Sequence, residues 1–216
     1  MSKFKEIGVS KDLCQGINEM GFINPTEVQE KSIPFLLFEN RDLISLAQTG
    51  TGKTAAFGLP VIQKTVLKNK FVQSIILCPT RELCIQICKD FETYSKYVSG
   101  IKILAVYGGA NIETQIKSLN KGVHIVVGTP GRTKDLIKRK VLKLELVDKV
   151  VLDEADEMLS MGFKDDLDFI LERTKSDRQT MLFSATISNE VKSISKRYMS
   201  DAKEISVSKI NSGAKN

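Results

Sequence analysis

A glycine-rich segment followed by lysine and threonine has the residue types that hold phosphate groups. It runs Gln48-Thr49-Gly50-Thr51-Gly52-Lys53-Thr54, between an apolar run at Leu43–Ala47 and an amphipathic run. Glycines let backbone N–H groups turn toward phosphates, and the amino end of the following helix adds a favourable dipole. We expect Lys53 to reach the β and γ phosphates of a nucleotide, and Thr54 to bind Mg²⁺. The alternative is a glycine-rich turn with a chance lysine; Ala47 stands where the general phosphate-loop pattern has its first glycine.

Three carboxylates follow a second apolar run. Val150–Leu152 leads directly into Asp153-Glu154-Ala155-Asp156. Open parallel sheets bind ligands at the carboxyl ends of their strands, so we expect Asp153 beside the phosphate loop, holding Mg²⁺ through its waters. Glu154 is then expected to orient, and to deprotonate, the attacking water. The alternative is a charge cluster at a helix N-terminus, where acids are favoured, but this does not explain an acid pair directly after a buried strand.

The elements that must position these residues alternate along the chain. Short, β-branched apolar runs predict strands, and the longer amphipathic segments between them predict helices. The predicted strands are Leu43–Ala47, Ser74–Pro79, Ile103–Tyr107, His124–Gly128, Val150–Asp153 and Thr180–Ser184. The predicted helices are Lys11–Met20, Thr26–Phe38, Lys53–Lys68, Arg81–Val98, Ile112–Asn120, Lys134–Lys140, Lys164–Thr174 and Asn189–Tyr198. This alternation predicts an α/β fold with a mainly parallel sheet, helices on both faces and right-handed crossovers.

Composition limits the class of protein. Of 216 residues, 42% are hydrophobic and 27% charged, which is typical of a globular chain, and the net charge of +6 favours a polyanionic partner. The four cysteines and the single histidine form no zinc pattern, so we expect no zinc site and no disulfide framework. The sequence shows no signal peptide and no membrane-spanning run, so a soluble protein with reduced thiols in the cytoplasm is expected.

At Asp153-Glu154-Ala155-Asp156 the sequence resembles the DEAD-box RNA helicase family, whose naming motif it contains. Upstream, Gly21-Phe22 through Pro25-Thr26 and Gln29, with Phe4, resembles the adenine-reading Q motif of that family. Gln29 offers the donor and the acceptor that match adenine N6 and N7. Phe4 and Phe22 would form an apolar wall around the base, although core or staple packing is the alternative for each taken alone.

Three further turns resemble the RNA-gripping motifs of the family. Each follows a predicted strand, so we expect them along one rim of the sheet. The residues assigned to RNA binding are Pro79, Thr80, Arg81, Gly108, Gly109, Thr129, Gly131 and Arg132. Hydroxyls, glycine amides, helix N-termini and arginines suit a sugar-phosphate backbone, which implies binding that is independent of base sequence. Ser184-Ala185-Thr186 resembles the motif that couples hydrolysis to unwinding, and its hydroxyls are expected to bond to Asp156; an ordinary helix cap is the alternative.

The resemblance implies a RecA-like P-loop NTPase fold, ATP and Mg²⁺ as cofactors, and an RNA-dependent ATPase that unwinds short RNA duplexes. It also implies a second RecA-like domain with arginine fingers, without which this part should be nearly inactive. The expected organisation is N-terminal helices with the Q motif at 1–40, the ATP-binding domain at 41–205 and a linker or cut end at 206–216. Two alternatives stay open: an ATP-gated RNA clamp or RNP assembly factor, and a P-loop ATPase that acts on DNA or without nucleic acid.

Overall fold

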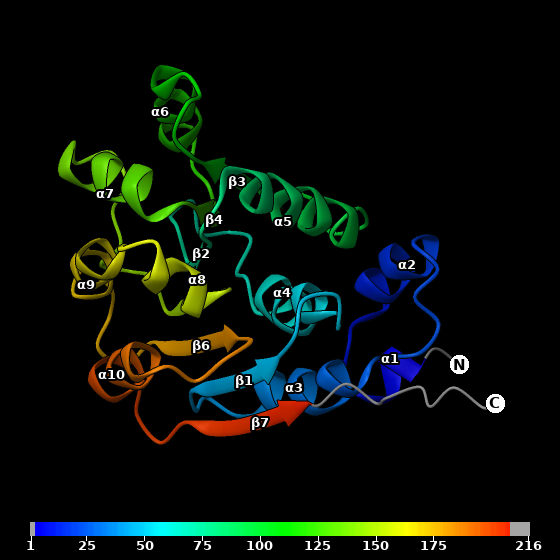
Figure 1. The fold of residues 1–216 in the computed structure, drawn as a ribbon. Coiled ribbons are helices and arrows are strands. Elements are labelled where there is room, and N and C mark those ends of the chain that lie inside the picture. The colour runs from blue at the N-terminus through cyan, green and yellow to red at the C-terminus, as the bar shows by residue number, and fades with distance from the viewer. Residues whose placement is uncertain (1–2, 208–216) are drawn as a thin grey trace.

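Seven parallel strands form one sheet in the computed structural model, which describes residues 3–207 (Figure 1). Their order from edge to edge is β3-β4-β2-β5-β6-β1-β7. The strands are β1 (Leu43–Ala47), β2 (Ser74–Leu77), β3 (Ile103–Val106), β4 (Ile125–Gly128), β5 (Lys149–Leu152), β6 (Gln179–Ser184) and β7 (Lys203–Val207). Every neighbouring pair is parallel, so all the carboxyl ends lie along one edge of the sheet.

Ten described helices cover the two faces of this sheet. They are α1 (Lys3–Glu6), α2 (Lys11–Glu19), α3 (Glu27–Phe38), α4 (Lys53–Gln63), α5 (Arg81–Tyr94), α6 (Ile112–Asn120), α7 (Pro130–Lys138), α8 (Ala155–Ser160), α9 (Lys164–Leu171) and α10 (Asn189–Tyr198). One apolar cluster joins the sheet to α1–α5, and a second joins it to α6–α10. This is the predicted α/β architecture with helices on both faces.

Side-chain alternation along the central strands explains these two cores. On β2, Ile76 packs into the cluster under α1–α5, whereas Ile75 and Leu77 pack into the other. Successive strand residues point to opposite faces, so a strand covered on both sides must be apolar at every position. Phe4 and Leu13 of the N-terminal helices belong to the first cluster. The described N-terminal residues 3–40 therefore pack against the sheet as part of one core.

Several element boundaries differ from the sequence expectations. The structure adds the short helices α1 and α8 and the strand β7. Ser206 and Val207 pair with β1, which corrects the expected start of the linker at 206; residues 208–216 lie outside the described part. Helix α7 begins at Pro130 rather than at Lys134, because proline is well suited to the first turn of a helix. Among the described helices, none combines the length and the apolar character needed to cross a membrane.

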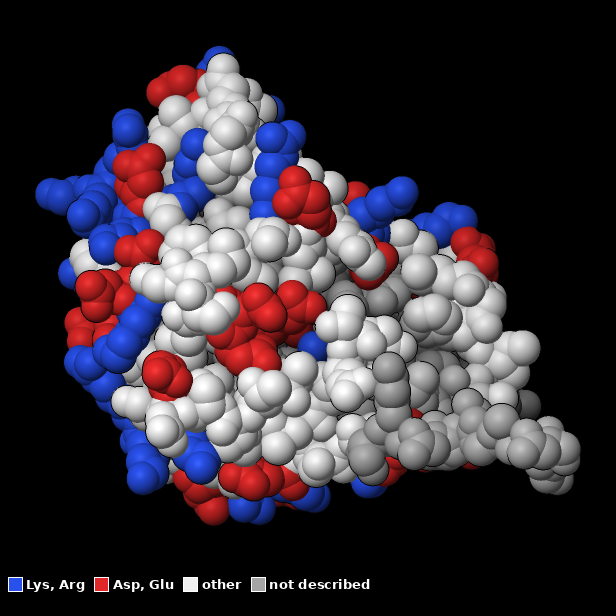
Figure 2. Space-filling model, viewed as in Figure 1, with Lys and Arg blue, Asp and Glu red and all other residues white. Residues whose placement is uncertain are grey.

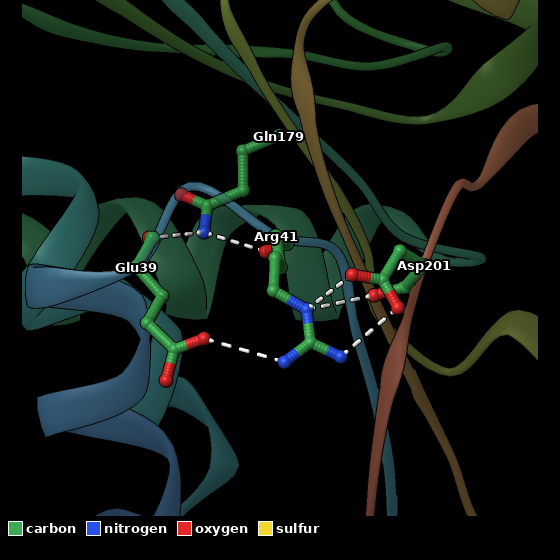
Figure 3. Close-up of polar contacts among 4 residues, drawn as sticks. All are labelled: Glu39, Arg41, Gln179 and Asp201. Atoms are coloured by element: carbon green, nitrogen blue, oxygen red, sulfur yellow. Dashed lines mark hydrogen bonds and ion pairs between the residues drawn. The ribbon is translucent and has the colours of Figure 1, made fainter.

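The amino edge of the sheet is closed by polar contacts that bring three strand starts together (Figure 3). Arg41, just before β1, forms an ion pair with Asp201, just before β7, at 2.7 Å. Gln179, the first residue of β6, donates from its side-chain amide to the backbone oxygens of Glu39 at 3.1 Å and Arg41 at 2.8 Å. These contacts fix the edge strand β7 although its sequence carries a weak strand signal.

Candidate functional site

The predicted phosphate loop links β1 to α4. Gly50 and Gly52 have φ values of +82° and +91°, in the left-handed region that glycine adopts without strain. The Thr51 hydroxyl donates to the Gln48 carbonyl oxygen at 2.7 Å and tightens the turn. The loop therefore delivers the amino end of α4, with its unpaired N–H groups, to the carboxyl edge of the sheet.

Lys53 and Asp153 form a buried charge pair at this point. Lys53 is 6% exposed and Asp153 is 2% exposed, and Lys53 Nζ lies 3.9 Å from Asp153 Oδ1. The ammonium has no hydrogen-bond partner among the described residues. Burial raises the pKa of Asp153 to about 6, with Lys53 opposing the rise and Glu154 adding to it. A buried ammonium without hydrogen bonds is costly, and phosphate oxygens would satisfy it.

Glu154, the next residue, has a backbone conformation that is unusual for any residue other than glycine. Its φ is +51°, in the left-handed region, and it is the N-cap residue of α8. The Thr49 hydroxyl lies 3.4 Å from Glu154 Oε1. The left-handed backbone lets two successive acids, Asp153 and Glu154, face the same site. Figure 2 shows acidic atoms gathered at the centre of this face.

Asp156 joins the acidic turn to the segment after β6. Its Oδ2 accepts bonds from the Thr186 amide at 2.9 Å and the Thr186 hydroxyl at 2.8 Å. Partial burial alone would raise the pKa of Asp156, but the Thr186 and Ser184 hydroxyls outweigh it and lower the pKa. The Ser184 hydroxyl donates to the Thr186 carbonyl oxygen at 2.8 Å. The structure has the expected contact for Thr186, and its role in coupling stays a prediction.

The predicted base-reading segment lies against the phosphate loop. Gln29 is 2% exposed; its Nε2 donates to the Gly52 carbonyl at 3.1 Å, and its Oε1 accepts from the Thr26 amide at 3.0 Å. The Thr26 hydroxyl donates to the Thr51 carbonyl at 2.8 Å. Thr26 and Gln29 also form the capping box of α3. The amide of Gln29 thus fastens two motifs together and retains one N–H and one lone pair for a base.

The two predicted wall residues differ in exposure. Phe22 is partly exposed and packs between Phe4 and Tyr94, with ring centroids 6.3 Å apart in both pairs. Phe4 is fully buried in the core. Phe4 therefore packs against Phe22 within the core, and the wall of the two rings around a base stays a prediction.

The three segments predicted to bind RNA follow neighbouring strands. The Pro79 motif comes after β2, the Gly108 motif after β3 and the Thr129 motif after β4, and the sheet order β3-β4-β2 places them along one rim as expected. Thr80, Arg81, Gly108, Gly109 and Gly131 are exposed, Thr129 and Arg132 are half-buried, and Pro79 is buried. The remaining strands β5, β6 and β1 carry the acidic, coupling and phosphate segments along the same edge.

The two arginines of the rim already have partners. Arg81 stacks over the Tyr107 ring at 5.1 Å. Arg132 donates to the Ala110 carbonyl oxygen at 3.2 Å and to Gln115 Oε1 at 3.1 Å. Gln115, a buried residue of α6, could not be predicted from the sequence, because its contact depends on how α6 and α7 meet. Both arginine side chains are therefore held by neighbouring groups of the protein.

The sequence of the chain is similar to those of known proteins. Residues 26–194 match the DEAD/DEAH box helicase family model. The chain is 52% identical over 199 residues to the ATP-dependent RNA helicase CshA of Listeria monocytogenes, covering 92% of this chain and 38% of that protein. It is 46% identical to the DEAD-box ATP-dependent RNA helicase CshA of Geobacillus kaustophilus, covering 96% and 44%.

A solved structure of a similar protein has the same fold. A DEAD box protein from Methanococcus jannaschii is 42% identical and superposes with a TM-score of 0.91 over 95% of this chain and 56% of that one. The fold is thus the RecA-like fold of such proteins. The chain spans about two fifths of the length of the curated relatives it matches. The match covers the phosphate loop, the acidic turn and the rim motifs, and the chain belongs to the DEAD/DEAH box helicase family.

Proposed function

We propose that this chain is the ATP-binding part of an ATP-dependent RNA helicase, in which ATP hydrolysis drives local separation of RNA duplexes. The observation that carries the proposal is the buried Lys53 ammonium at the phosphate loop, for which residues 3–207 offer no hydrogen-bond partner. Phosphate oxygens are the acceptors that this position lacks. The names of the relatives, which are ATP-dependent RNA helicases, support the same activity.

The residues around Lys53 also fit Mg²⁺. This ion prefers oxygen ligands, keeps several waters and uses one or two carboxylates beside the phosphates of its nucleotide. Thr54 would hold it directly and the Asp153 carboxylate through water, and the bound ion would neutralise charge that develops on the phosphates. Glu154 would accept the proton of the attacking water. Gln48, Thr49, Gly50, Thr51 and Gly52 would surround the phosphates, and Phe22, Thr26 and Gln29 the adenine.

RNA would bind along the rim formed after β2, β3 and β4. Exposed hydroxyls, glycine amides and helix N-termini make contacts to sugars and phosphates that carry no base information. Asp156, Ser184 and Thr186 would couple the two sites, because they link the acidic turn to β6. A second RecA-like domain would complete both sites, so we expect residues 1–216 to hydrolyse ATP barely above background. The cytoplasm is the compartment we propose.

The experiment that tests this function is calorimetric titration of residues 1–216 with ATP and Mg²⁺. Lys53→Ala should weaken binding of ATP by about 2 kcal/mol or more, since a charge-assisted contact is lost. Lys64→Ala provides the matched control, because Lys64 is a half-buried lysine at the other end of the same helix. Unchanged ATP affinity in Lys53→Ala would overturn the proposal.

A further inference from the structure

Helices α7 and α9 pack against each other, and their two ends differ in charge balance. Near the rim, Lys134 of α7 forms an ion pair with Asp166 of α9 at 2.6 Å. At the far end, Lys138 of α7 and Arg173, just after α9, lie over the ring of Phe169 at 5.8 and 3.5 Å from its centroid, and Lys134 lies over the same ring at 5.5 Å. Unlike Lys134, neither Lys138 nor Arg173 has an ion-pair partner within residues 3–207, although Arg173 donates a hydrogen bond to the Phe169 carbonyl oxygen at 2.7 Å.

The acids nearby are already engaged. Asp168 binds Lys164 at 2.7 Å and Arg197 at 3.3 Å, and Glu172 binds Arg197 at 2.8 Å. On α7, Asp135 binds Arg139 at 2.9 Å. The remaining acid of α9, Asp165, lies in its first turn, at the opposite end. Within the described part of α7 and α9, the acids at the far end are therefore engaged, whereas Glu145, in the chain after α7, is exposed.

The chain after α7 adds two more lysines to this end. Lys140 has a φ of +59°, a conformation more usual for glycine, and its amide bonds to the Ile137 carbonyl oxygen at 2.8 Å. The amide of Leu142 bonds to the Leu136 carbonyl oxygen at 3.2 Å, so the chain folds back over the last turn of α7. Lys140 and Lys143 are exposed. We call Lys138, Lys140, Lys143 and Arg173 the distal basic cluster.

The helix dipole offers a simpler explanation for part of this cluster. Cations are favoured near the carboxyl end of a helix, which accounts for Lys138 or Lys140 singly. It does not account for three cations that share one aromatic ring, two of which have no ion-pair partner within residues 3–207. Figure 2 shows basic atoms, with acidic atoms between them, at the left edge of the molecule, over the outer end of α7. An excess of positive charge attracts a polyanion.

The position of the distal basic cluster relative to the rim indicates which kind of polyanion binds to it. The amino end of α7 carries Thr129, Gly131 and Arg132 of the rim, and the cluster stands at its carboxyl end. A helix of this length separates the two by about 12 Å, at about 1.5 Å per residue. A strand held at the rim therefore needs only a short extension along α7 to reach the cluster.

We propose that the distal basic cluster is a second contact site for RNA, which binds the phosphates of nucleotides flanking the segment held at the rim. The inference rests on the proposed RNA-binding function. It predicts that RNA longer than the rim binds more tightly and with a steeper salt dependence than RNA that covers the rim alone. Acidic proteins or anionic lipid surfaces are the competing partners of such a cluster.

The test compares two oligouridines by fluorescence anisotropy, of about 6 and about 20 nucleotides, since single-strand sites span about 4 to 16 nucleotides per domain. Lys138→Gln, Lys140→Gln and Lys143→Gln together should lower affinity for the long RNA by about tenfold or more and reduce its salt slope by about 2. Affinity for the short RNA should stay unchanged. The matched control is Lys68→Gln, Lys70→Gln and Lys121→Gln, three exposed lysines away from α7 that remove the same charge.

The outcomes separate the two proposals. Absence of binding of either RNA by the wild-type chain would overturn the proposed function itself. Binding of both RNAs with equal losses in the cluster variant and the control variant would overturn only the second site. An equal loss for short and long RNA would also overturn it, because the cluster would then belong to the rim. Replacing the same three lysines by arginine should retain the length dependence, and its loss would again contradict the proposal.

Discussion

The carboxyl edge of the sheet has two halves that are built on opposite electrostatic principles. Around β5, β6 and β1, the charge pair of Lys53 and Asp153 is buried, and the Lys53 ammonium has no hydrogen-bond partner among the described residues. Around β3, β4 and β2, the charged groups are partnered: Arg81 by an aromatic ring and Arg132 by neutral oxygens. We therefore expect a ligand in the first half to satisfy one buried charge, whereas the second half is a satisfied surface where we expect a ligand to add many small contacts.

The largest expected effect lies in the first half, around β5, β6 and β1. Glu154→Gln keeps the size of the side chain but removes the carboxylate that accepts a proton. In a chain joined to its second domain, ATP hydrolysis should fall by about 10² or more while ATP affinity stays similar. Steady-state and binding measurements on the same preparation check this. Glu157→Gln, an exposed acid one turn later, should retain turnover, and normal turnover in Glu154→Gln would move the catalytic role elsewhere.

The second prediction uses the raised pKa of Asp153. A carboxyl whose folded pKa is about 6, above its usual value of 3.8, binds more protons in the folded state between these values. Stability of the ligand-free protein should therefore fall as pH rises from about 4 to above 6, by about 2 to 3 kcal/mol from this group. Asp153→Asn should remove that part of the pH dependence in urea unfolding.

The pKa of Asp156 is shifted in the opposite direction from that of Asp153, so Asp156 provides a second test in the same unfolding measurement. Its pKa is lowered by Thr186 and Ser184 despite the effect of burial, so its contribution to stability is present above its ordinary pKa and is lost as pH falls through the lowered value. Asp156→Asn should thus change the pH profile with the opposite sign from Asp153→Asn. The same sign in both variants would contradict the contrast drawn within the acidic turn.

The third prediction concerns Gln29. Gln29→Ala should lower the preference for ADP over GDP by about 1–3 kcal/mol, because a bidentate amide contact to adenine is lost. Calorimetry with both nucleotides measures it. Gln73→Ala is a matched control: Gln73 is also buried and its amide also bonds twice to backbone, at Val66. Equal affinity of the wild type for ADP and GDP would exclude the adenine-reading role.

The smallest expected effect lies in the satisfied half. Arg81→Gln should weaken RNA binding by a fewfold and reduce the slope of log affinity against log salt by about 0.7, because one phosphate contact is removed. Arg81→Lys should restore most of the slope. A loss as large as that of Lys53→Ala for ATP would break the comparison, since it would mean that the rim also depends on one dominant charge.

Sequence patterns predicted the parts of the fold that burial dictates. All six predicted strands are present, because strands covered on both faces must be apolar throughout. The strand β7 was missed because an edge strand needs few apolar positions, and only Ile205 of its five residues is buried. Helix α8 was missed because it has six residues and begins at a left-handed Glu154.

In the site, local motifs were predictable and contacts between them were not. The phosphate loop and the acidic turn each depend on one strand and one turn, which are visible in the sequence. The partners of Arg132 and the burial of Phe4 depend on how distant segments pack, and no local pattern encodes this. The contact between the Gln29 amide and Gly52 likewise depends on the packing of distant segments.

The contact between Gln29 and Gly52 has a consequence for how these positions can change over evolutionary time. A Cβ at position 52 would lie 2.5 Å from Gln29 Nε2, and the φ of +91° there adds its own penalty. Substitutions at the two sites should therefore be strongly non-additive, since residues that share a contact do not vary independently. Although the two residues are separated by 23 positions in the chain, we expect them to change together rather than one at a time. A library that randomises either site alone will recover almost only the residues already present.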